Sequence, residues 1–269
     1  IVMTGAQSRA TLRHTTVEHH SYGVRVESSH NQNREVKDII IEDSVFRSGG
    51  TPLYKNVWGN NWWSFAFRRN TVETTSGYGL YWYTYADSVS ILDNTIKNGQ
   101  IYLYYLDDAQ GQYEIKRNTL EGTNAKIYFD GYTGRSTNNQ ESFTHITHNS
   151  IKNSNQSNPL DVRYTYGDVS ISNNTIDNSS GSGYSLYYQS TENYPRSLRI
   201  DNNTLSSRYH GIYVNNEKGS DNVSITGNKL SRNTNYSSDG WGLRADHVGG
   251  LIEKNEIKNF AGGLYLSGS

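Results

Sequence analysis

A six-residue pattern that recurs along the whole chain constrains the fold more than any other feature. It carries apolar residues at its ends and a polar residue, usually asparagine, at its fourth position, as in ILDNTI (91–96) and ISNNTI (171–176). The fourth positions are Thr15, Ser44, Asn70, Asn94, Asn118, Asn149, Asn174, Asn203, Asn228 and Asn255. The spacing of these ten copies runs from 24 residues (Asn70 to Asn94) to 31 residues (Asn118 to Asn149). Such a period is typical of a solenoid and not of a two-domain globular chain.

Each copy predicts two short strands joined by a polar corner. Apolar and β-branched residues lie on both sides of the corner, as in VSI before Asn94 and TI after it. Asparagine suits the bend because it tolerates a left-handed backbone and forms local hydrogen bonds. We expect the asparagines of successive copies to stack in register and to bond to one another from coil to coil.

A third strand, rich in tyrosine, appears in every period. Examples are YGVRVES (22–28), GLYWYTY (79–85), QIYLYYL (100–106) and GIYVNNE (211–217), with weaker copies in LYKN (53–56) and LDVR (160–163). Three parallel strands per period predict an all-β fold, a right-handed parallel β-helix of about ten coils of three short strands. We expect one such domain over residues 1–269.

The repeats, of the form G-I-x-V…I-x-N-N-x-I as in GIYVNNEKGSDNVSITGNKL (211–230), resemble the pectate-lyase-like β-helix superfamily over the whole chain. The chain also looks like the β-helical carbohydrate-binding modules attached to xylan-degrading enzymes. That resemblance implies a secreted, extracellular, non-catalytic module excised from a larger multimodular protein, with covalently linked catalytic or other modules as partners. The resemblance sets the expectation for the fold, whereas function depends on the site.

Composition excludes several classes of function. The 25 basic and 26 acidic residues give a net charge of −1, so we expect no nucleic-acid partner. Cysteine is absent, which excludes disulfides and thiolate metal sites. No run of 18 apolar residues occurs, so we expect no membrane span. We expect no cofactor and no metal site, although the oxygen-rich segment YLDDAQG (105–111) leaves calcium binding possible.

The tyrosines of the third strand predict an aromatic band on one face of the rod. Because alternate strand residues point to opposite faces, Leu80 and Trp82 belong to the core while Tyr81 and Tyr83 point outward. The same outward position in successive coils holds Arg25, Tyr54, Tyr81, Tyr102, Tyr128, Asp161, Tyr187, Tyr213, Arg244 and Tyr265, and the next one adds Tyr83 and Tyr104. Contiguous exposed aromatic surface is typical of a binding site.

We therefore expect the band to bind a linear plant polysaccharide, with xylan favoured, through ring faces that cover C–H groups and hydroxyls that hydrogen-bond. Trp58, Trp62 and Trp63 in NVWGNNWWSFAF (56–67) are candidate contacts from a loop, as are Trp241, Arg244 and Asp246 at the far end. Two alternatives stay open. In the first, the band serves only to stiffen an exposed sheet. In the second, the chain is a structural or adhesive surface rod.

An enzyme is the other alternative, a lyase or hydrolase of an acidic polysaccharide. Asp130, Asp161 and Arg163, with Lys126 nearby, include the carboxylates and the cation that such reactions use. The opposing interpretation is a surface ion pair of little energetic value. The paired Asp107 and Asp108 resemble those of pectin hydrolases of this fold, which also carry a Gly-His-Gly and an Arg-x-Lys segment. The nearest match to Gly-His-Gly, YHG (209–211), lies four coils away, and the Arg-x-Lys segment is absent, as is the Trp-x-Asp-His segment of pectate lyases. These departures favour binding over catalysis.

Overall fold

A computed structural model describes most of the chain. The described residues are 1–4, 9–27, 38–56, 64–75, 77–83, 86–106, 111–131, 142–178, 180–190, 195–216, 222–233 and 240–268. Within them every regular element is a β-strand, so the predicted all-β class is confirmed.

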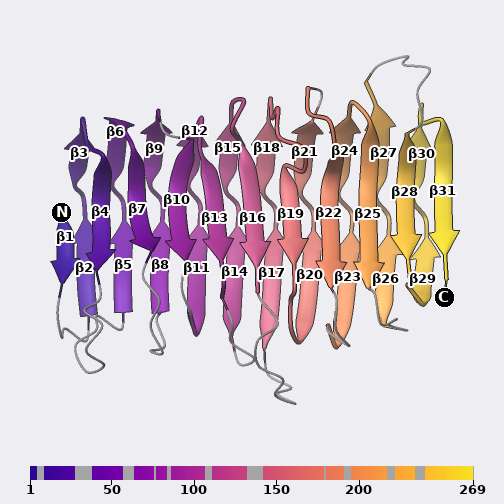
Figure 1. Cartoon of the computed structure of the whole chain (residues 1–269), viewed down its shortest axis with the longest axis horizontal. Coiled ribbons are helices and arrows are strands. Elements are labelled where there is room, and N and C mark those ends of the chain that lie inside the picture. Colours follow the sequence, from indigo (N-terminus) through magenta and orange to yellow (C-terminus); the bar gives the residue numbers. More distant parts are fainter. Residues whose placement is uncertain are drawn as a thin grey trace.

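The strands stack side by side along a rod, with the two ends of the chain at its opposite ends (Figure 1). They form three parallel sheets, here named A, B and C in the order in which the chain visits them. Each strand pairs with the equivalent strand of the next coil, as in β10 with β13, β11 with β14 and β12 with β15. This is the predicted parallel β-helix with three strands per coil. Sheet A has eleven strands, one more than the ten coils expected, because both β1 and β31 belong to it.

Sheet A contains β1 (Val2–Thr4), β4 (Tyr22–Glu27), β7 (Thr51–Asn56), β10 (Tyr78–Tyr83), β13 (Gln100–Tyr104), β16 (Lys126–Asp130), β19 (Leu160–Arg163), β22 (Tyr184–Ser190), β25 (His210–Asn216), β28 (Trp241–Asp246) and β31 (Gly262–Ser267). Sheet B contains β2 (Arg9–Arg13), β5 (Asp38–Glu42), β8 (Ser64–Arg68), β11 (Ser88–Leu92), β14 (Gln112–Lys116), β17 (Phe143–Thr147), β20 (Asp168–Ser172), β23 (Ser197–Asp201), β26 (Val223–Thr226) and β29 (Gly250–Glu253). Sheet C contains β3 (Thr16–Glu18), β6 (Val45–Gly49), β9 (Thr71–Thr74), β12 (Thr95–Lys97), β15 (Thr119–Glu121), β18 (Ser150–Lys152), β21 (Thr175–Asn178), β24 (Thr204–Ser207), β27 (Lys229–Arg232) and β30 (Glu256–Lys258).

The core runs through the middle of the rod, between the three sheets. Each coil contributes inward residues from every sheet, and they stand in register with those of the next coil. Leu80 and Trp82 are fully buried, as predicted from strand alternation. The ring of Trp82 stacks on Phe65 of sheet B at 4.1 Å between centroids, so aromatic packing joins two sheets across the interior.

The corner between sheets B and C is an asparagine ladder, as predicted. Asn118 shows the arrangement: its side-chain oxygen accepts the backbone N–H (3.1 Å) and the amide N–H (2.9 Å) of Asn94. Its own amide donates to the carbonyl of Ile91 at 2.9 Å and to Asn149 at 3.0 Å. The ladder runs from Asn70 to Asn255 and is extended by Ser44, whose backbone N–H donates to Asn70. The buried amides of this ladder are thereby satisfied within the protein.

The role predicted for asparagine at this corner is wrong in one detail. The left-handed residue is the one before the ladder position, with φ of 53° at Arg69, 58° at Asp93 and 56° at Arg117. The chain turns at that residue, so the following asparagine is free to direct its amide inward. On the outside of the corner, Arg117 grips Asp93 of the preceding coil with two hydrogen bonds of 2.7 and 2.8 Å.

Candidate functional site: the tyrosine face of sheet A

The outward side of sheet A, here called the tyrosine face, carries the predicted column of aromatic residues in register. The successive partners are Arg25, Tyr54, Tyr81, Tyr102, Tyr128, Asp161, Tyr187, Tyr213, Arg244 and Tyr265. The tyrosines of this column are partly exposed, whereas residues between the outward positions, such as Leu80 and Leu103, are fully buried. The predicted alignment of phenol side chains on the outside of the rod is therefore present.

The rings of this column stack on one another along the rod. The centroids of Tyr54 and Tyr81 lie 5.2 Å apart, those of Tyr81 and Tyr102 lie 5.2 Å apart at 2°, and those of Tyr102 and Tyr128 lie 4.6 Å apart at 11°. Each inner ring thus covers the face of its neighbour. The faces of Tyr81 and Tyr102 are therefore covered by neighbouring rings, and the expected contact through ring faces stays a prediction.

A second column packs beside the first and widens the aromatic surface. Tyr83 stacks on Tyr104 at 5.0 Å, and Tyr104 lies 6.2 Å from both Tyr102 and Tyr128. Burial, then the neighbouring phenols, raises the pKa of Tyr81 and of Tyr102 to about 12. These hydroxyls are therefore protonated throughout the neutral range and can both donate and accept hydrogen bonds.

A third column of aromatic side chains lies at the start of the sheet A strands. Of its members, only Trp241 is predicted from the sequence as a site residue. Tyr78 packs edge-on against Tyr81 and Tyr102, and Tyr184 stacks on His210 at 4.5 Å. Strict alternation from the buried Leu80 assigns Tyr78 to the interior, which is wrong because the register shifts between Tyr78 and Leu80.

A sequence signal for this third column exists. An aromatic residue followed by glycine begins four of the strands, at Tyr22-Gly23, Tyr78-Gly79, His210-Gly211 and Trp241-Gly242. The glycine allows a close approach of the chain to the interior. A Cβ atom at Gly79 would lie 2.6 Å from Ile96, and one at Gly242 would lie 2.3 Å from Ile257.

An ion cluster interrupts the tyrosine column at Asp161. Arg163 donates to the Asp161 carboxylate through Nε at 2.7 Å and through a terminal nitrogen at 3.1 Å, and Lys126 donates to it at 3.1 Å. The Arg163 guanidinium lies over the rings of Tyr128 (5.6 Å) and Tyr187 (5.1 Å) and so continues the stack. Asp161 is only 2% exposed, which corrects the interpretation of this group as a surface ion pair.

Asp130 lies beside this cluster, opposite Arg163 in the register as predicted. It accepts the hydroxyl of Tyr128 at 3.0 Å, and it is 4% exposed. Burial, followed by the charge of Asp130, raises the pKa of the Tyr128 phenol. Both oxygens of Asp161 accept hydrogen bonds from cations, and Asp130 is almost fully buried. Neither carboxylate is therefore open to solvent as a base. A catalytic role for Asp130, Asp161 and Arg163 stays a prediction.

The far end of the face repeats this construction with Arg244 and Asp246. Arg244 donates to Asp246 at 2.9 Å, and its guanidinium lies 5.3 Å from the centroid of Tyr213 and 5.2 Å from that of Tyr265. Burial alone would raise the pKa of Asp246, but hydrogen bonds from Arg244, Ser267 and Tyr213 outweigh it and lower that pKa. The predicted flanking residue Trp241 packs on Tyr265 at 5.1 Å.

Several predicted residues lie outside the described part of the chain. They are Trp58, Trp62 and Trp63, within 57–63, and Asp107 and Asp108, within 107–110, which includes the core of the possible calcium segment. Among the described residues, no group of three His, Asp or Glu side chains is close enough to hold a metal ion. No helix in that part of the chain is long and apolar enough to cross a membrane.

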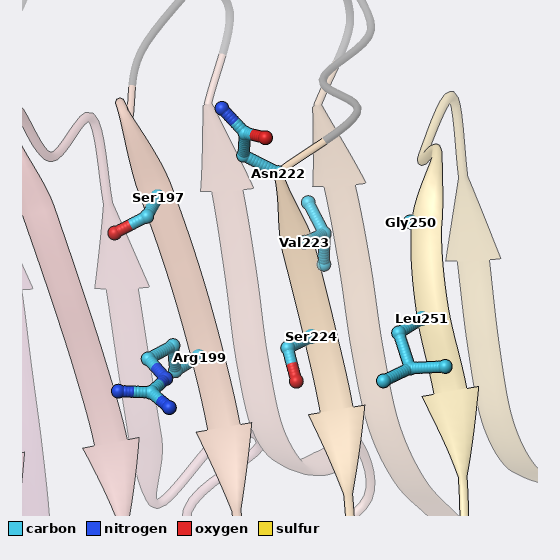
Figure 2. Close-up of a pocket in the computed structure, with 7 residues that line it drawn as sticks. All are labelled: Ser197, Arg199, Asn222, Val223, Ser224, Gly250 and Leu251. Atoms are coloured by element: carbon cyan, nitrogen blue, oxygen red, sulfur yellow. The ribbon is translucent and has the colours of Figure 1, made fainter.

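Two hollows of the described surface lie on sheet B. The larger, about 530 Å³, spans β23, β26 and β29 and is lined by Ser197, Arg199, Asn222, Val223, Ser224, Gly250 and Leu251 (Figure 2). In Figure 2 Arg199, Ser224 and Leu251 stand side by side on adjacent strands. A smaller one of about 190 Å³ lies over β2, β5, β8 and β11. Neither includes a residue of the tyrosine face.

The comparisons with known proteins agree with this architecture. No curated protein and no solved structure matches the chain. The family described as right handed beta helix region matches residues 1–164 and again residues 161–269. The protein therefore belongs to the right-handed β-helix family along its whole length.

Proposed function

We propose that the protein binds a linear plant polysaccharide, with xylan favoured, along the tyrosine face, as a non-catalytic module. The observation that supports this most directly is the stacked row of Tyr54, Tyr81, Tyr102 and Tyr128, each of them partly exposed on the outer side of sheet A. Successive strands of a sheet lie about 4.8 Å apart, so hydroxyls recur along the rod at an interval close to one sugar unit. Such a row can hydrogen-bond the hydroxyls of a polymer lying parallel to the rod axis.

The fold itself does not demand tyrosine in this column. Arg25, Asp161 and Arg244 occupy the same position in three coils, and their strands keep the parallel register of their neighbours. Seven tyrosines at the remaining positions therefore need an explanation other than backbone geometry. A binding surface supplies one, because exposed contiguous aromatic side chains are costly unless they contact something.

Binding also fits the charged residues of the face better than catalysis does. A lyase or hydrolase needs a carboxylate that can take or give a proton next to the substrate. The Asp161 carboxylate is instead enclosed by Lys126 and Arg163, and Asp130 accepts a phenol hydroxyl. These contacts hold both carboxylates in place, which favours a binding surface over a catalytic site.

Affinity electrophoresis against xylan, mixed-linkage glucan, mannan and pectin tests this proposal. We expect retardation by at least one of these polymers, xylan foremost, and loss of that retardation in the double variant Tyr81→Ala/Tyr102→Ala. The matched control is Phe143→Ala/His145→Ala, which removes a stacked ring pair from the outer side of sheet B. Retardation that survives the first variant, or release of sugar products from any of the polymers, would refute binding without turnover at this face.

A further inference from the structure

The tyrosine face carries charged residues, yet their arrangement leaves no net charge for a ligand to meet. We infer that the face selects uncharged segments of a glycan and discriminates against segments that bear uronic acids. This inference rests on the proposed function and specifies the class of substrate for the same site.

The positive and negative charges of the face are equal in number. The outward residues of the sheet A strands, within the part of the chain that the structure describes, include four cations and four carboxylates. The cations are Arg25, Lys126, Arg163 and Arg244, and the carboxylates are Glu27, Asp130, Asp161 and Asp246. The tyrosine face, which we propose binds a glycan through tyrosine hydroxyls, therefore has a net charge of zero.

Each cation is held by a carboxylate of the same or the adjacent coil. Arg25 contacts Glu27 at 2.9 Å, Arg244 contacts Asp246 at 2.8 Å, and Arg163 contacts Asp161 at 2.7 Å. Lys126 shares Asp161 at 3.1 Å. The three arginine pairs join positions i and i+2 of one strand, so the two side chains lie on the same face by strand geometry and need no rearrangement to meet.

Two of the carboxylates that pair with arginines are shielded from solvent. The side chain of Asp161 is 2% exposed and that of Asp246 is 6% exposed, while their arginines are 31% and 39% exposed. A uronate that took Arg163 or Arg244 as its partner would have to draw the guanidinium from a buried carboxylate and leave that carboxylate unpaired. Such a loss is strongly unfavourable, so a uronate gains nothing from these arginines.

The planar guanidinium groups of these arginines instead lie against the aromatic rings of the column. The guanidinium of Arg163 bridges the rings of Tyr128 and Tyr187, and that of Arg244 bridges Tyr213 and Tyr265. Both continue the row across positions without a ring. Burial lowers the pKa of the neighbouring His210 and raises that of Tyr213 to about 12, and both shifts favour the uncharged form.

Titration calorimetry at low and at high salt tests the selection, with three probes: unsubstituted linear xylan, glucuronosyl-substituted xylan and polygalacturonate. We expect the neutral polymer to bind with less than a twofold change between the two salt concentrations, because no net charge is screened. We expect at least tenfold weaker binding of polygalacturonate, equivalent to about 1.4 kcal/mol. The substituted xylan should bind at an intermediate level, through its bare segments.

The variant Asp246→Asn provides the sharper test, because it removes the compensating charge and retains a hydrogen-bond acceptor for Arg244. We expect it to raise the affinity for polygalacturonate about tenfold in a salt-sensitive way, since a hydrogen bond to an ion becomes available. Asp161→Asn is a second variant at an independent position, with the same expected direction. Asp201→Asn on sheet B is the control for a mere change in net charge and should leave polygalacturonate binding unchanged.

The outcomes separate this inference from the proposed function. Wild-type protein that prefers polygalacturonate to neutral xylan, or an Asp246→Asn variant that folds like the wild type by circular dichroism without gaining affinity for it, would overturn the charge selection and keep glycan binding. Failure of every probe to bind would overturn both.

Discussion

Two rows of repeated side chains run along this rod: the asparagine ladder, here called the inner ladder, and the tyrosine column, here called the outer ladder. The asparagine ladder at the corner between sheets B and C is unbroken from Asn70 to Asn255. The tyrosine column of sheet A is broken at Asp161 and again at Arg244. Both follow the same coil repeat, so the difference lies in what each side chain does.

Each inner asparagine is required by the fold. Asn149 is 2% exposed, and its amide accepts from two groups of Asn118 and donates to Ile115 and Asn174. A buried position with four such bonds tolerates little else. The outer column has no comparable requirement, because tyrosine, arginine and aspartate all sit there on the same backbone. A repeated residue that the backbone does not need is evidence for a role outside the fold.

Breaking the inner ladder should produce the largest effect on stability. Asn149→Ala removes four buried hydrogen bonds and leaves donors of Asn118 and acceptors of its neighbours unpaired, so we expect a loss of about 4 kcal/mol in the free energy of unfolding. Urea unfolding followed by circular dichroism measures it. Ser44→Ala, at the end of the ladder where one hydroxyl accepts from Thr15 and donates to Glu42, should lose only about 1 kcal/mol. Equal losses would mean that the ladder is not the main support of the corner.

Breaking the outer ladder should affect binding more than stability. Tyr102→Ala removes a ring stacked on both sides and its hydroxyl, and we expect at least a tenfold loss of polysaccharide affinity, about 1.4 kcal/mol. Tyr102→Phe, which keeps the stack, should lose roughly fivefold if the hydroxyl makes the contact. Tyr113→Phe is the inverse control, because the Tyr113 hydroxyl bonds the carbonyls of Ala86 and Leu106 in the interior. It should lower stability and leave binding unchanged.

Alkaline pH should distinguish the ladders, since amides do not titrate and phenols do. The folded-state pKa is about 12 at Tyr81, Tyr102 and Tyr213, against 10.0 for an ordinary tyrosine. A raised pKa stabilises the fold fully below pH 10, and that contribution is lost as the pH rises through 12. Solvent screening of these partly exposed rings limits the loss to about 1 kcal/mol each.

Urea midpoints at about pH 9 and about pH 11 measure this loss, and the Tyr81→Phe/Tyr102→Phe variant should show a smaller decrease between them. A decrease of the same size in the variant would assign the alkaline sensitivity to other tyrosines.

Most of the architecture is predictable from the repeat. The spacing of the corner residues predicts the coils, the alternation around Trp82 predicts the core, and both agree with the structure because backbone pairing and burial impose them on every coil. The left-handed corner residue lies one position before the predicted asparagine, since a run of polar residues such as Asp93-Asn94 does not show which one turns the chain.

The site was less predictable, because it depends on how side chains orient toward each other. Strand alternation gives an outward column but not the near-parallel stacking of Tyr81 and Tyr102 that hides their faces. Nor does spacing reveal that Lys126 and Arg163 converge on Asp161 from two strands. The aromatic-glycine pairs could have revealed Tyr78, but only with the knowledge that a bulge follows it.

Completing the outer ladder should have the smallest effect of all. Arg25→Tyr places a phenol opposite Tyr54 at the first position of the column, where a guanidinium now lies over the ring of Tyr22. We expect the free energy of unfolding to change by less than about 1 kcal/mol, because a gained aromatic contact offsets a lost ion pair whose side chains are 47% and 38% exposed. Urea unfolding with an unchanged circular dichroism spectrum would support a column that the fold leaves free to vary. A loss of several kcal/mol would show that Arg25 is part of the scaffold, and the outer ladder would then resemble the inner one.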